Sequence, residues 1–288
     1  MLFFSKKKIT FFLYIVFIWC YGFASELQTE SVPIVLVSVA PHKFFVEKIG
    51  GKTVQVYLMV PSGASSHTYE PTPKQMMRAG KGDIWFRIGE PFENRAMQAL
   101  TYHRPSLQIV DLRSSLNVIS TNSCSCCPGC IDLHFWLSLR EAKVQAKTIA
   151  DALSKTYPEH KDIYQTNLLS FQKELDELDQ QIQHLLAPLK KRIVVVSHPA
   201  YGYFCRDYQL QQYSIEVEGK DPTPAQVTRL LMTLRPLGIR SIFVQMQYSN
   251  KAAQLIADQL GASLVTLDPY SEEYFRTMLE IAHAFASQ

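Results

Sequence analysis

The sequence has little net charge, and beyond its N-terminal segment it contains no apolar run long enough to cross a bilayer. Its 288 residues carry a formal net charge of +3. A balance this small provides neither a basic surface for nucleic acid nor an acidic low-complexity tail, so we expect no nucleic-acid partner. The sequence also lacks a compact metal-binding motif such as HExxH, and no nucleophile motif or oxyanion-type loop accompanies its histidines. These absences argue against a nucleic-acid-binding protein and against the familiar hydrolase classes.

The N-terminal segment has the features of an export signal. Three lysines at positions 6–8 precede the apolar run ITFFLYIVFIWCYGF, which ends near Ala24. A positive start, an apolar centre and small residues at the end are typical of a secretory signal peptide. We therefore predict a signal peptide over residues 1–24 and a mature protein in the periplasm or at the outer face of the cytoplasmic membrane. The alternatives are an uncleaved anchor, because the run approaches membrane-spanning length, and a lipid on Cys20, although the preceding FIW lacks the small residues that such processing needs.

The remainder of the chain alternates apolar runs with helical patterns. Hydrophobic residues make up 47% of the sequence, which is ample for a core. Short β-type runs separated by helical segments and short loops indicate parallel sheets of the α/β class. The alternation occurs twice, with a long helical pattern between its halves. We therefore predict an α/β protein of two lobes with parallel-type sheets: an N-terminal lobe over residues 25–157, a rigid connector helix over 158–190 and a C-terminal lobe over 191–288.

The connector pattern places apolar residues at spacings of three and four. At about 1.5 Å per residue the segment from Glu159 to Ala187 would be about 40 Å long. It is polar on most faces, so we expect it to lie across the two lobes. A coiled-coil dimer is the alternative, although the pattern does not keep a clean heptad. No sequence repeat relates the two lobes beyond the alternation itself. The apolar positions are Ile163, Leu168, Phe171, Leu175, Leu178, Ile182 and Leu185.

Four potential metal ligands follow apolar runs or close long loops. His198 ends the run IVVVS, and His67 follows the run VQVYLMV. His134 closes a long irregular connection, and Asp268 ends the run SLVTL. Open α/β proteins bind ligands beyond the carboxyl ends of their strands, and three neutral imidazoles with one carboxylate suit a divalent transition ion such as Zn²⁺. Two ligands from each lobe would hold the ion in the cleft between the lobes.

Several aromatic residues lie close in sequence to these ligands. They either seal the ion from water or belong to the ordinary core, and the sequence leaves both interpretations open. They are Tyr69, Trp136, Tyr201, Tyr203 and Phe204.

The motifs around the four residues resemble a known family. SSHTYEPTPKQM, DLHFWLSL, VVVSHPAYGYF, IFVQMQYSNKAAQLIA and LVTLDPY occur in this order across nearly the whole mature chain. They are similar to motifs of the metal-binding solute-binding proteins of bacterial ABC importers, the zinc, manganese and iron family called cluster A-I. The resemblance implies two α/β lobes joined by a long rigid helix, with one ion buried in the cleft and delivered to a membrane permease. It places the ligands at His67, His134, His198 and Asp268.

The resemblance also bears on which ion is bound. Histidine at the third ligand position, His198, is more often associated with zinc in the family, so zinc is favoured, with manganese or iron as other possible cargo. Two departures affect this preference. Gln245-Met246 stands where the family commonly has Glu-Pro, which would weaken the charge around the ligands. In DLHFWLSL, Leu133 and Ser138-Leu139 replace residues of the usual Asp-Pro-His-x-Trp-x-Asp-Pro.

A cysteine cluster stands where zinc members of the family often carry a His-rich acidic loop. Cys124, Cys126, Cys127 and Cys130 precede the second histidine ligand, and Cys205 is the remaining cysteine of the mature chain. Disulfides are the simplest interpretation in an oxidising compartment, although a bond between the adjacent pair would be strained. An accessory site for a soft ion and free or lipid-modified thiols are the alternatives.

Three hypotheses for function follow from these patterns. The first is a monomeric extracytoplasmic binding protein, not an enzyme, that delivers a divalent metal ion to an ABC permease. The second is a secreted zinc-dependent hydrolase, in which three histidines hold the ion and Asp268 is a base or a displaceable ligand. The third, an adhesin-like surface protein, rests on export alone and would not need four ligands at strand ends. We favour the first, because no catalytic motif accompanies the histidines.

Overall fold

The computed structural model describes residues 32–121, 130–217 and 220–288. The residues from Pro33 to Gln288 form one compact unit. The predicted signal peptide lies outside the described residues, as do Cys124, Cys126 and Cys127. Within the described ranges, no helix has both the length and the apolarity needed to cross a membrane.

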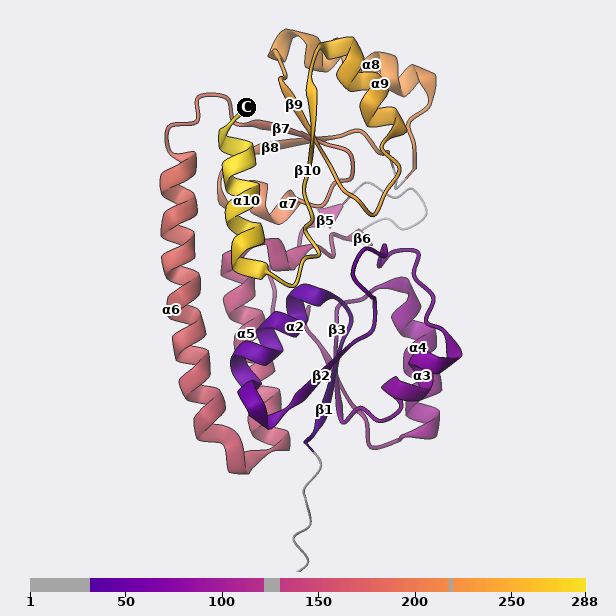
Figure 1. Cartoon of the computed structure of the whole chain (residues 1–288), viewed down its shortest axis with the longest axis vertical. Coiled ribbons are helices and arrows are strands. Elements are labelled where there is room, and N and C mark those ends of the chain that lie inside the picture. Colours follow the sequence, from indigo (N-terminus) through magenta and orange to yellow (C-terminus); the bar gives the residue numbers. More distant parts are fainter. Residues whose placement is uncertain (1–31, 122–129, 218–219) are drawn as a thin grey trace, which may run out of the picture. The chain divides into compact units, whose positions relative to one another are not determined.

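The first lobe is built on a parallel sheet of four strands in the order β2-β1-β3-β4 (Figure 1). Each strand is followed by a helix or a long connection, as the alternation of apolar runs predicts. The strands are β1 (Ile34–Val37), β2 (Gln55–Leu58), β3 (Ile84–Arg87) and β4 (Gln108–Asp111). The helices are α2 (Ala40–Gly50), η1 (Gly51–Thr53), α3 (Pro73–Ala79) and α4 (Pro91–His103).

The second lobe repeats this topology, with a parallel sheet in the order β10-β9-β7-β8. Two α/β lobes with parallel sheets are therefore confirmed. The strands are β7 (Ile193–Val196), β8 (Gln211–Ser214), β9 (Ser241–Val244) and β10 (Ser263–Thr266). The helices are α7 (Gly202–Asp207), α8 (Pro224–Leu234), η4 (Arg235–Leu237), α9 (Lys251–Leu260) and α10 (Tyr274–Ala286).

The two lobes share a short sequence repeat, so the expectation that only the alternation relates them is wrong. The helices α3 and α8 follow equivalent strands, and their starts read EPTPKQMMR at 70–78 and DPTPAQVTR at 221–229. In both, a threonine caps the helix by accepting from the backbone N–H of a glutamine three residues later, while the glutamine side chain reaches back to the cap. Proline follows at the first helical position, where its missing N–H costs nothing.

The connection between the lobes is more structured than the sequence predicts. It contains a two-stranded antiparallel hairpin, β5 (Ser120–Thr121) with β6 (Cys130–Ile131). After this hairpin come two helical segments, η2 (Phe135–Leu137) and α5 (Leu139–Thr156). The break lies at Ser138, whose side chain accepts a hydrogen bond from the N–H of Glu141 and so caps α5. Next come η3 (Pro158–His160) and α6 (Lys161–Leu186).

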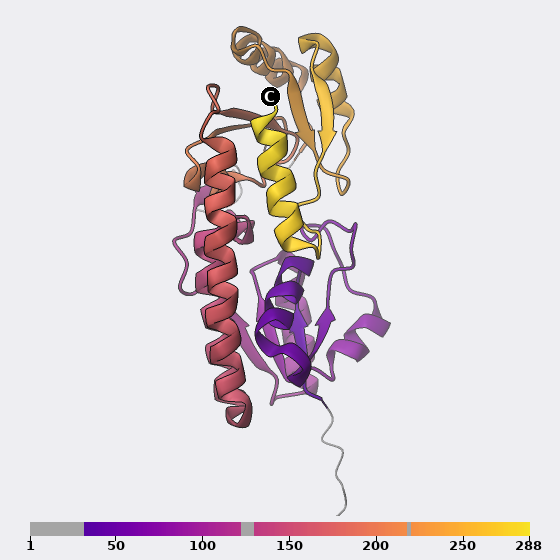
Figure 2. The ribbon, with the colours of Figure 1, turned by 60° about the vertical axis from the view of Figure 1, so that its left-hand side comes forward.

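The long helix α6 lies within the range predicted for the connector and packs against α5, α2 and α10. It runs beside both sheets (Figures 1 and 2). Its buried stripe occupies one face, so the apolar residues that suggested a coiled coil are covered within the chain itself. The prediction was wrong at Ile163, which is 45% exposed, because the neighbouring Tyr164 takes the buried position. The buried residues are Tyr164, Leu168, Phe171, Leu175, Leu178, Ile182 and Leu186.

Each sheet forms the middle of a three-layer sandwich, because alternate side chains of its strands enter different cores. Val35 and Val37 face a core shared with α2, α5 and α6, whereas Leu36 faces a smaller core with α3 and α4. In the second lobe, Val194 and Val196 join the first of these cores. That core is therefore continuous from one lobe to the other. It fixes the lobes together along the side opposite α3, α4, α8 and α9.

We predict that truncating Phe171 in the middle of α6 destabilises the whole molecule. Phe171 is fully buried and contacts the rings of Phe45 and Phe275. Phe171→Ala should therefore lower the free energy of unfolding by about 3–5 kcal/mol, measured by chemical denaturation. Leu169→Ala is the matched control, because Leu169 on the same helix is 69% exposed; its effect should stay within about 0.5 kcal/mol. Equal effects of the two substitutions would contradict the assigned buried face.

Candidate metal centre

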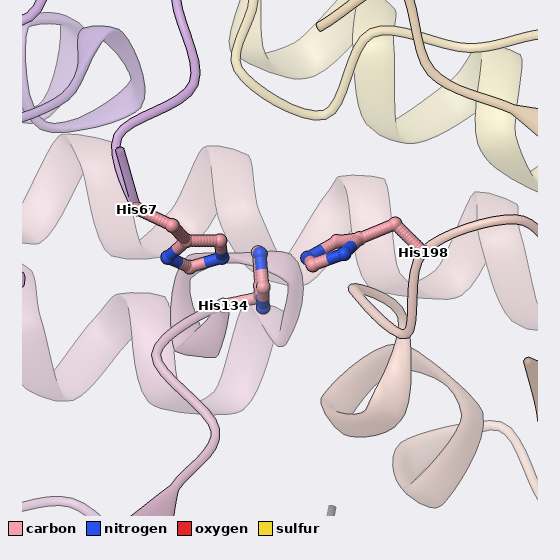
Figure 3. Close-up of side chains that lie close together, drawn as sticks. All are labelled: His67, His134 and His198. Carbon is pink, nitrogen blue, oxygen red and sulfur yellow. The ribbon is translucent and has the colours of Figure 1, made fainter. Parts of the chain in front are cut away.

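Three of the four predicted ligands come together between the lobes. The ring centroids of His67, His134 and His198 are each 5.2 Å from the other two. One ring nitrogen from each residue lies within 4.8 Å of the other two. Figure 3 shows the three rings converging, with His134 between His67 and His198. Tetrahedral zinc with bonds of about 2.0–2.1 Å holds its ligand nitrogens roughly 3.4 Å apart, so a small inward shift brings the three rings to bonding distance.

The topology of the two sheets explains this convergence. His198 lies two residues beyond β7, and His67 lies in the loop that leaves β2. Each of these strands points its carboxyl end towards the boundary between the lobes, where parallel sheets place their ligands. His134 reaches the same point from the connection, directly before η2. The three histidines therefore come from the first lobe, the connection and the second lobe.

A carboxylate holds the outer nitrogen of His198. The Nδ1 atom of His198 lies 2.7 Å from Oε2 of Glu216, which continues the neighbouring strand β8. The N–H of Glu216 donates to the carbonyl of Ser197, so the parallel ladder extends to the site and fixes both residues. The Nε2 atom of His198 is buried and has no hydrogen-bond partner among the described residues. The ring therefore carries its proton on Nδ1 and leaves Nε2 as the ligand atom.

His67 has the same arrangement with a buried glutamate. Its Nδ1 lies 2.9 Å from Oε2 of Glu90, whose other oxygen accepts from the hydroxyl of Ser66 at 2.6 Å. The turn that carries Glu90 is itself shaped by a second carboxylate. Glu93 accepts hydrogen bonds from the backbone N–H groups of Ile88 and Gly89 at 2.9 and 2.6 Å. The position of Glu90 beneath His67 therefore depends on the start of α4.

His134 is oriented by a carboxylate two residues before it. Oδ1 of Asp132 lies 2.8 Å from Nδ1 of His134 and also accepts from the backbone N–H of His134 at 2.9 Å. The hydroxyl of Tyr203, from the second lobe, donates to the carbonyl of Asp132. Close packing also requires Gly202, because a Cβ there would lie 2.7 Å from Oδ2 of Asp132. The geometry of this loop therefore depends on α7.

The opposite nitrogen of His134 is engaged by a tyrosine. Its Nε2 lies 3.0 Å from the hydroxyl of Tyr270, which also lies 3.2 Å from the hydroxyl of Ser66. Burial raises the pKa of Tyr270 well above its ordinary value, so the hydroxyl keeps its proton and donates to the imidazole. An ion bound at Nε2 of His134 would take the place of this hydrogen bond.

The pKa values of His198 and His67 are shifted in opposite directions. Burial lowers the pKa of His198 to about 4, with the neighbouring imidazoles acting in the same direction and the hydrogen bond to Glu216 opposing them. Burial also lowers the pKa of His67, but the hydrogen bond and charge of Glu90, with help from Asp132 and Glu216, raise it above the ordinary value of 6.5. His198 is therefore neutral and ready to bind near pH 7, whereas a proton competes for His67.

The fourth predicted ligand, Asp268, is not in the group formed by the three histidines. It lies directly beyond β10, as the sequence suggests, but its carboxylate is held elsewhere. Oδ1 of Asp268 accepts from Nε2 of Gln247 at 2.7 Å and from the backbone N–H of Tyr270 at 3.1 Å. The structure thus brings together three of the predicted ligands and leaves the carboxylate hydrogen-bonded to its own lobe.

Two tyrosines that the sequence did not single out line the centre. Tyr248 stacks on His198 with ring centroids 4.3 Å apart and planes inclined by 13°. Its hydroxyl reaches across to Ser65 of the first lobe at 3.4 Å. Tyr270 contacts His134 as described above. Among the five aromatic residues that lie close to the ligands in sequence, Trp136 packs on His134 with ring centroids 5.4 Å apart. Tyr69 packs instead on Phe92, and the core contains Tyr201, Tyr203 and Phe204.

Gln245, which stands where the family commonly has a glutamate, also has a defined position. Gln245 is 1% exposed, and its amide has no hydrogen-bond partner among the described residues. It therefore makes no hydrogen bond to any of the four predicted ligands. The one cysteine with a described side chain, Cys205, is buried with a free thiol.

The arrangement as a whole suits the capture of a cation. Each imidazole is backed by a carboxylate, from Glu90, Asp132 or Glu216, and such partners fix the tautomer and raise the basicity of the ring. These three carboxylates therefore place negative charge around the rings. A centre of nitrogen ligands surrounded by carboxylates favours a divalent transition ion.

Comparison with known proteins identifies the family. Residues 35–288 match the family model described as zinc-uptake complex component A, periplasmic. The chain belongs to this family. The match covers both lobes and the connector, and it makes the protein a solute-binding component and not an enzyme. The hydrolase hypothesis finds no support among the relatives.

Individual relatives agree with this assignment. A protein of Chlamydia muridarum named "Putative metal-binding protein" is 35% identical over 267 residues, which cover 92% of this chain and 94% of the relative. A metal ABC transporter substrate-binding lipoprotein of Lactococcus lactis is 28% identical over 225 residues, covering 75% of this chain and 72% of the relative. A crystal structure of ZnuA has a TM-score of 0.84 at 32% identity and covers 89% of this chain and 99% of that chain.

Two of the three outer carboxylates, Glu90 and Glu216, could not be recognised from the sequence. Glu90 and Glu216 are 23 and 18 residues from the histidines that they hold, and each reads as an ordinary polar residue of a loop. Asp132 is the exception, because its spacing of two residues from His134 is typical of a short loop in which one carboxylate accepts from both a ring and a backbone N–H.

We predict that Glu216→Gln weakens zinc binding about 10–100-fold, the range found when an outer partner of a metal ligand is lost. The amide keeps the size of the side chain but removes the charge that fixes His198. Isothermal titration or chelator competition measures the change. Glu280→Gln is the control, because Glu280 forms an exposed ion pair with Arg276 on α10. A Glu216→Gln protein with unchanged affinity would show that this carboxylate does not support the ligand.

Proposed function

We propose that this protein captures one divalent transition-metal ion, with zinc favoured over manganese or iron, and delivers it to the membrane permease of an ABC importer. The observation that carries the proposal is the convergence of three imidazoles, each with its Nδ1 held by a carboxylate. In this scheme Nε2 of His67, His134 and His198 binds the ion. Asp268 is the fourth ligand, which joins when its carboxylate approaches the rings.

The chemistry of the ligands supports zinc. Three neutral imidazoles and one carboxylate form a four-ligand set of the kind that tetrahedral zinc prefers. Ions such as manganese favour more oxygen ligands and a higher coordination number. The ion is cargo in this proposal, so the centre has to release it as well as bind it.

The cellular setting belongs to the same proposal. Membership in a periplasmic family and likeness to a lipoprotein of a metal ABC transporter support export and a permease partner. We propose that residues 1–24 are the export signal and that the protein acts in the periplasm or at the outer face of the cytoplasmic membrane. We further propose that it works as a monomer and binds no nucleic acid, in keeping with a net charge of only +3.

Replacement of His198 tests the ligand set directly. His198→Ala should weaken zinc binding by more than the roughly 10–100-fold expected for an outer partner. It should also abolish most of the rise in melting temperature that zinc produces, since a ligand at 100 times its Kd stabilises the folded state by about 2.7 kcal/mol. His184→Ala is the control, because His184 is exposed on α6. Full stoichiometry and affinity in His198→Ala would refute the assignment.

The affinity should also depend on pH in a defined direction. A proton on His67 competes with the ion, and the pKa of His67 lies above 6.5. Affinity is therefore highest above that pKa and falls as the pH drops through it. Since a group of pKa 6.5 is about ten-elevenths protonated at pH 5.5, zinc affinity should fall at least about tenfold between pH 7.5 and 5.5. Titrations with equal affinity at the two pH values would contradict a histidine site.

A further inference from the structure

The residue that holds Asp268 lies on the loop beyond β9, the strand next to β10. Nε2 of Gln247 donates to Oδ1 of Asp268 at 2.7 Å, and the backbone N–H of Tyr270 donates to the same oxygen at 3.1 Å. Both hydrogen bonds therefore fall on one oxygen of the carboxylate. The other oxygen, Oδ2, has no hydrogen-bond partner within residues 32–121, 130–217 and 220–288.

This arrangement matches that of the three histidines. In each histidine, Nδ1 is held by a carboxylate and Nε2 is the ligand atom; at His134, the ion would take the place of the hydrogen bond between Nε2 and Tyr270. An imidazole N–H needs an acceptor, which the carboxylates of Glu90, Asp132 and Glu216 supply. A carboxylate needs a donor, which the amide of Gln247 supplies. Gln247 is therefore the outer hydrogen-bond partner of Asp268, just as each of the three acids is the outer partner of one histidine.

The other glutamine of this loop does not share the role. The amide of Gln245 is buried and makes no hydrogen bond to the described residues. Gln247 is therefore the side chain of this loop that contacts a predicted ligand through a hydrogen bond. Because Val244 at the end of β9 pairs with Thr266 at the end of β10, the two strand ends carry Gln247 and Asp268 side by side.

We propose that Gln247 is a specificity-determining positioning residue. By holding Oδ1 of Asp268, it limits this carboxylate to a single bond, through Oδ2, to the ion. Three imidazole nitrogens and one oxygen complete the four ligands of zinc. A carboxylate released from Gln247 can offer both oxygens, which suits ions such as manganese that take more oxygen ligands. The inference rests on the proposed function, in which Asp268 is the fourth ligand.

The test compares zinc and manganese affinities of the full mature protein with Gln247 altered. Gln247→Leu removes the donor and keeps the approximate size, and Gln247→Met serves as a second variant without a branch. Loss of one charge-assisted hydrogen bond should reduce the preference for zinc over manganese, taken as the ratio of the two Kd values, by about tenfold. Chelator competition at pH 7.5 measures both constants, and unfolding of the metal-free protein checks that the variants fold.

Gln254→Leu is the matched control. Gln254 donates from the same atom, Nε2, to an aspartate, Asp258, at the same 2.7 Å, but the pair lies exposed on α9. Its removal should leave the ratio unchanged. Asp268→Ala provides the second control, because Gln247→Leu should have no further effect on the ratio once the carboxylate is gone.

The outcomes separate this inference from the proposed function. An unchanged ratio in Gln247→Leu, or a gain in zinc affinity, overturns the inference, since a gain would mean that Gln247 keeps Asp268 away from the ion. If Asp268→Ala leaves both affinities intact while His198→Ala abolishes binding, Asp268 is not a ligand and the inference falls, but capture by the histidines stands. If the unaltered protein binds neither ion, the proposed function itself fails.

Discussion

The hydrogen bond between each imidazole Nδ1 and a carboxylate is the interaction on which this centre depends. Three neutral rings pressed together without such partners would be free to rotate and to exchange tautomers. The carboxylates of Glu90, Asp132 and Glu216 each hold Nδ1 of one ring and so fix its orientation and tautomer. Each acid is in turn placed by backbone structure: Glu90 by the start of α4, Asp132 by its position directly after β6, and Glu216 by the extension of β8. The fold therefore positions the acids, and the acids in turn orient the imidazoles that bind the ion.

The contact between the lobes confines the movement that can release the ion. The indole of Trp136 donates to the carbonyl of Pro269, and the hydroxyl of Tyr274 donates to the carbonyl of Trp136. Arg206 of the second lobe also pairs with Glu141 at the start of α5. Together with the continuous core, these bonds resist a wide opening of the cleft. The contact between Tyr248, which stacks on His198, and Ser65 of the first lobe is longer, at 3.4 Å. These contacts therefore favour exchange of the ion through local movement of the loops around Tyr248.

Much of the fold could be predicted from the sequence because buried parallel strands appear as short apolar runs. The run at β7 and the residue that ends it, His198, are visible in this way. The start of β8 is not visible in this way, because its first residues, Gln211 and Gln212, are polar on an edge strand. The short helix α7 was missed, since its aromatic residues read as core and not as a helical pattern. Glu90, Glu216 and Gln247 were beyond prediction, because their roles arise from pairings between segments that are distant in sequence.

The central claim is that imidazole nitrogens, and not the cysteine sulfurs of the same chain, hold the cargo ion. X-ray absorption at the zinc edge of the full mature protein, loaded with one equivalent of zinc, measures this most directly. The account predicts a first shell of nitrogen and oxygen at about 2.0–2.1 Å, with the multiple-scattering pattern of about three imidazoles. A shell dominated by sulfur at about 2.3 Å would contradict it.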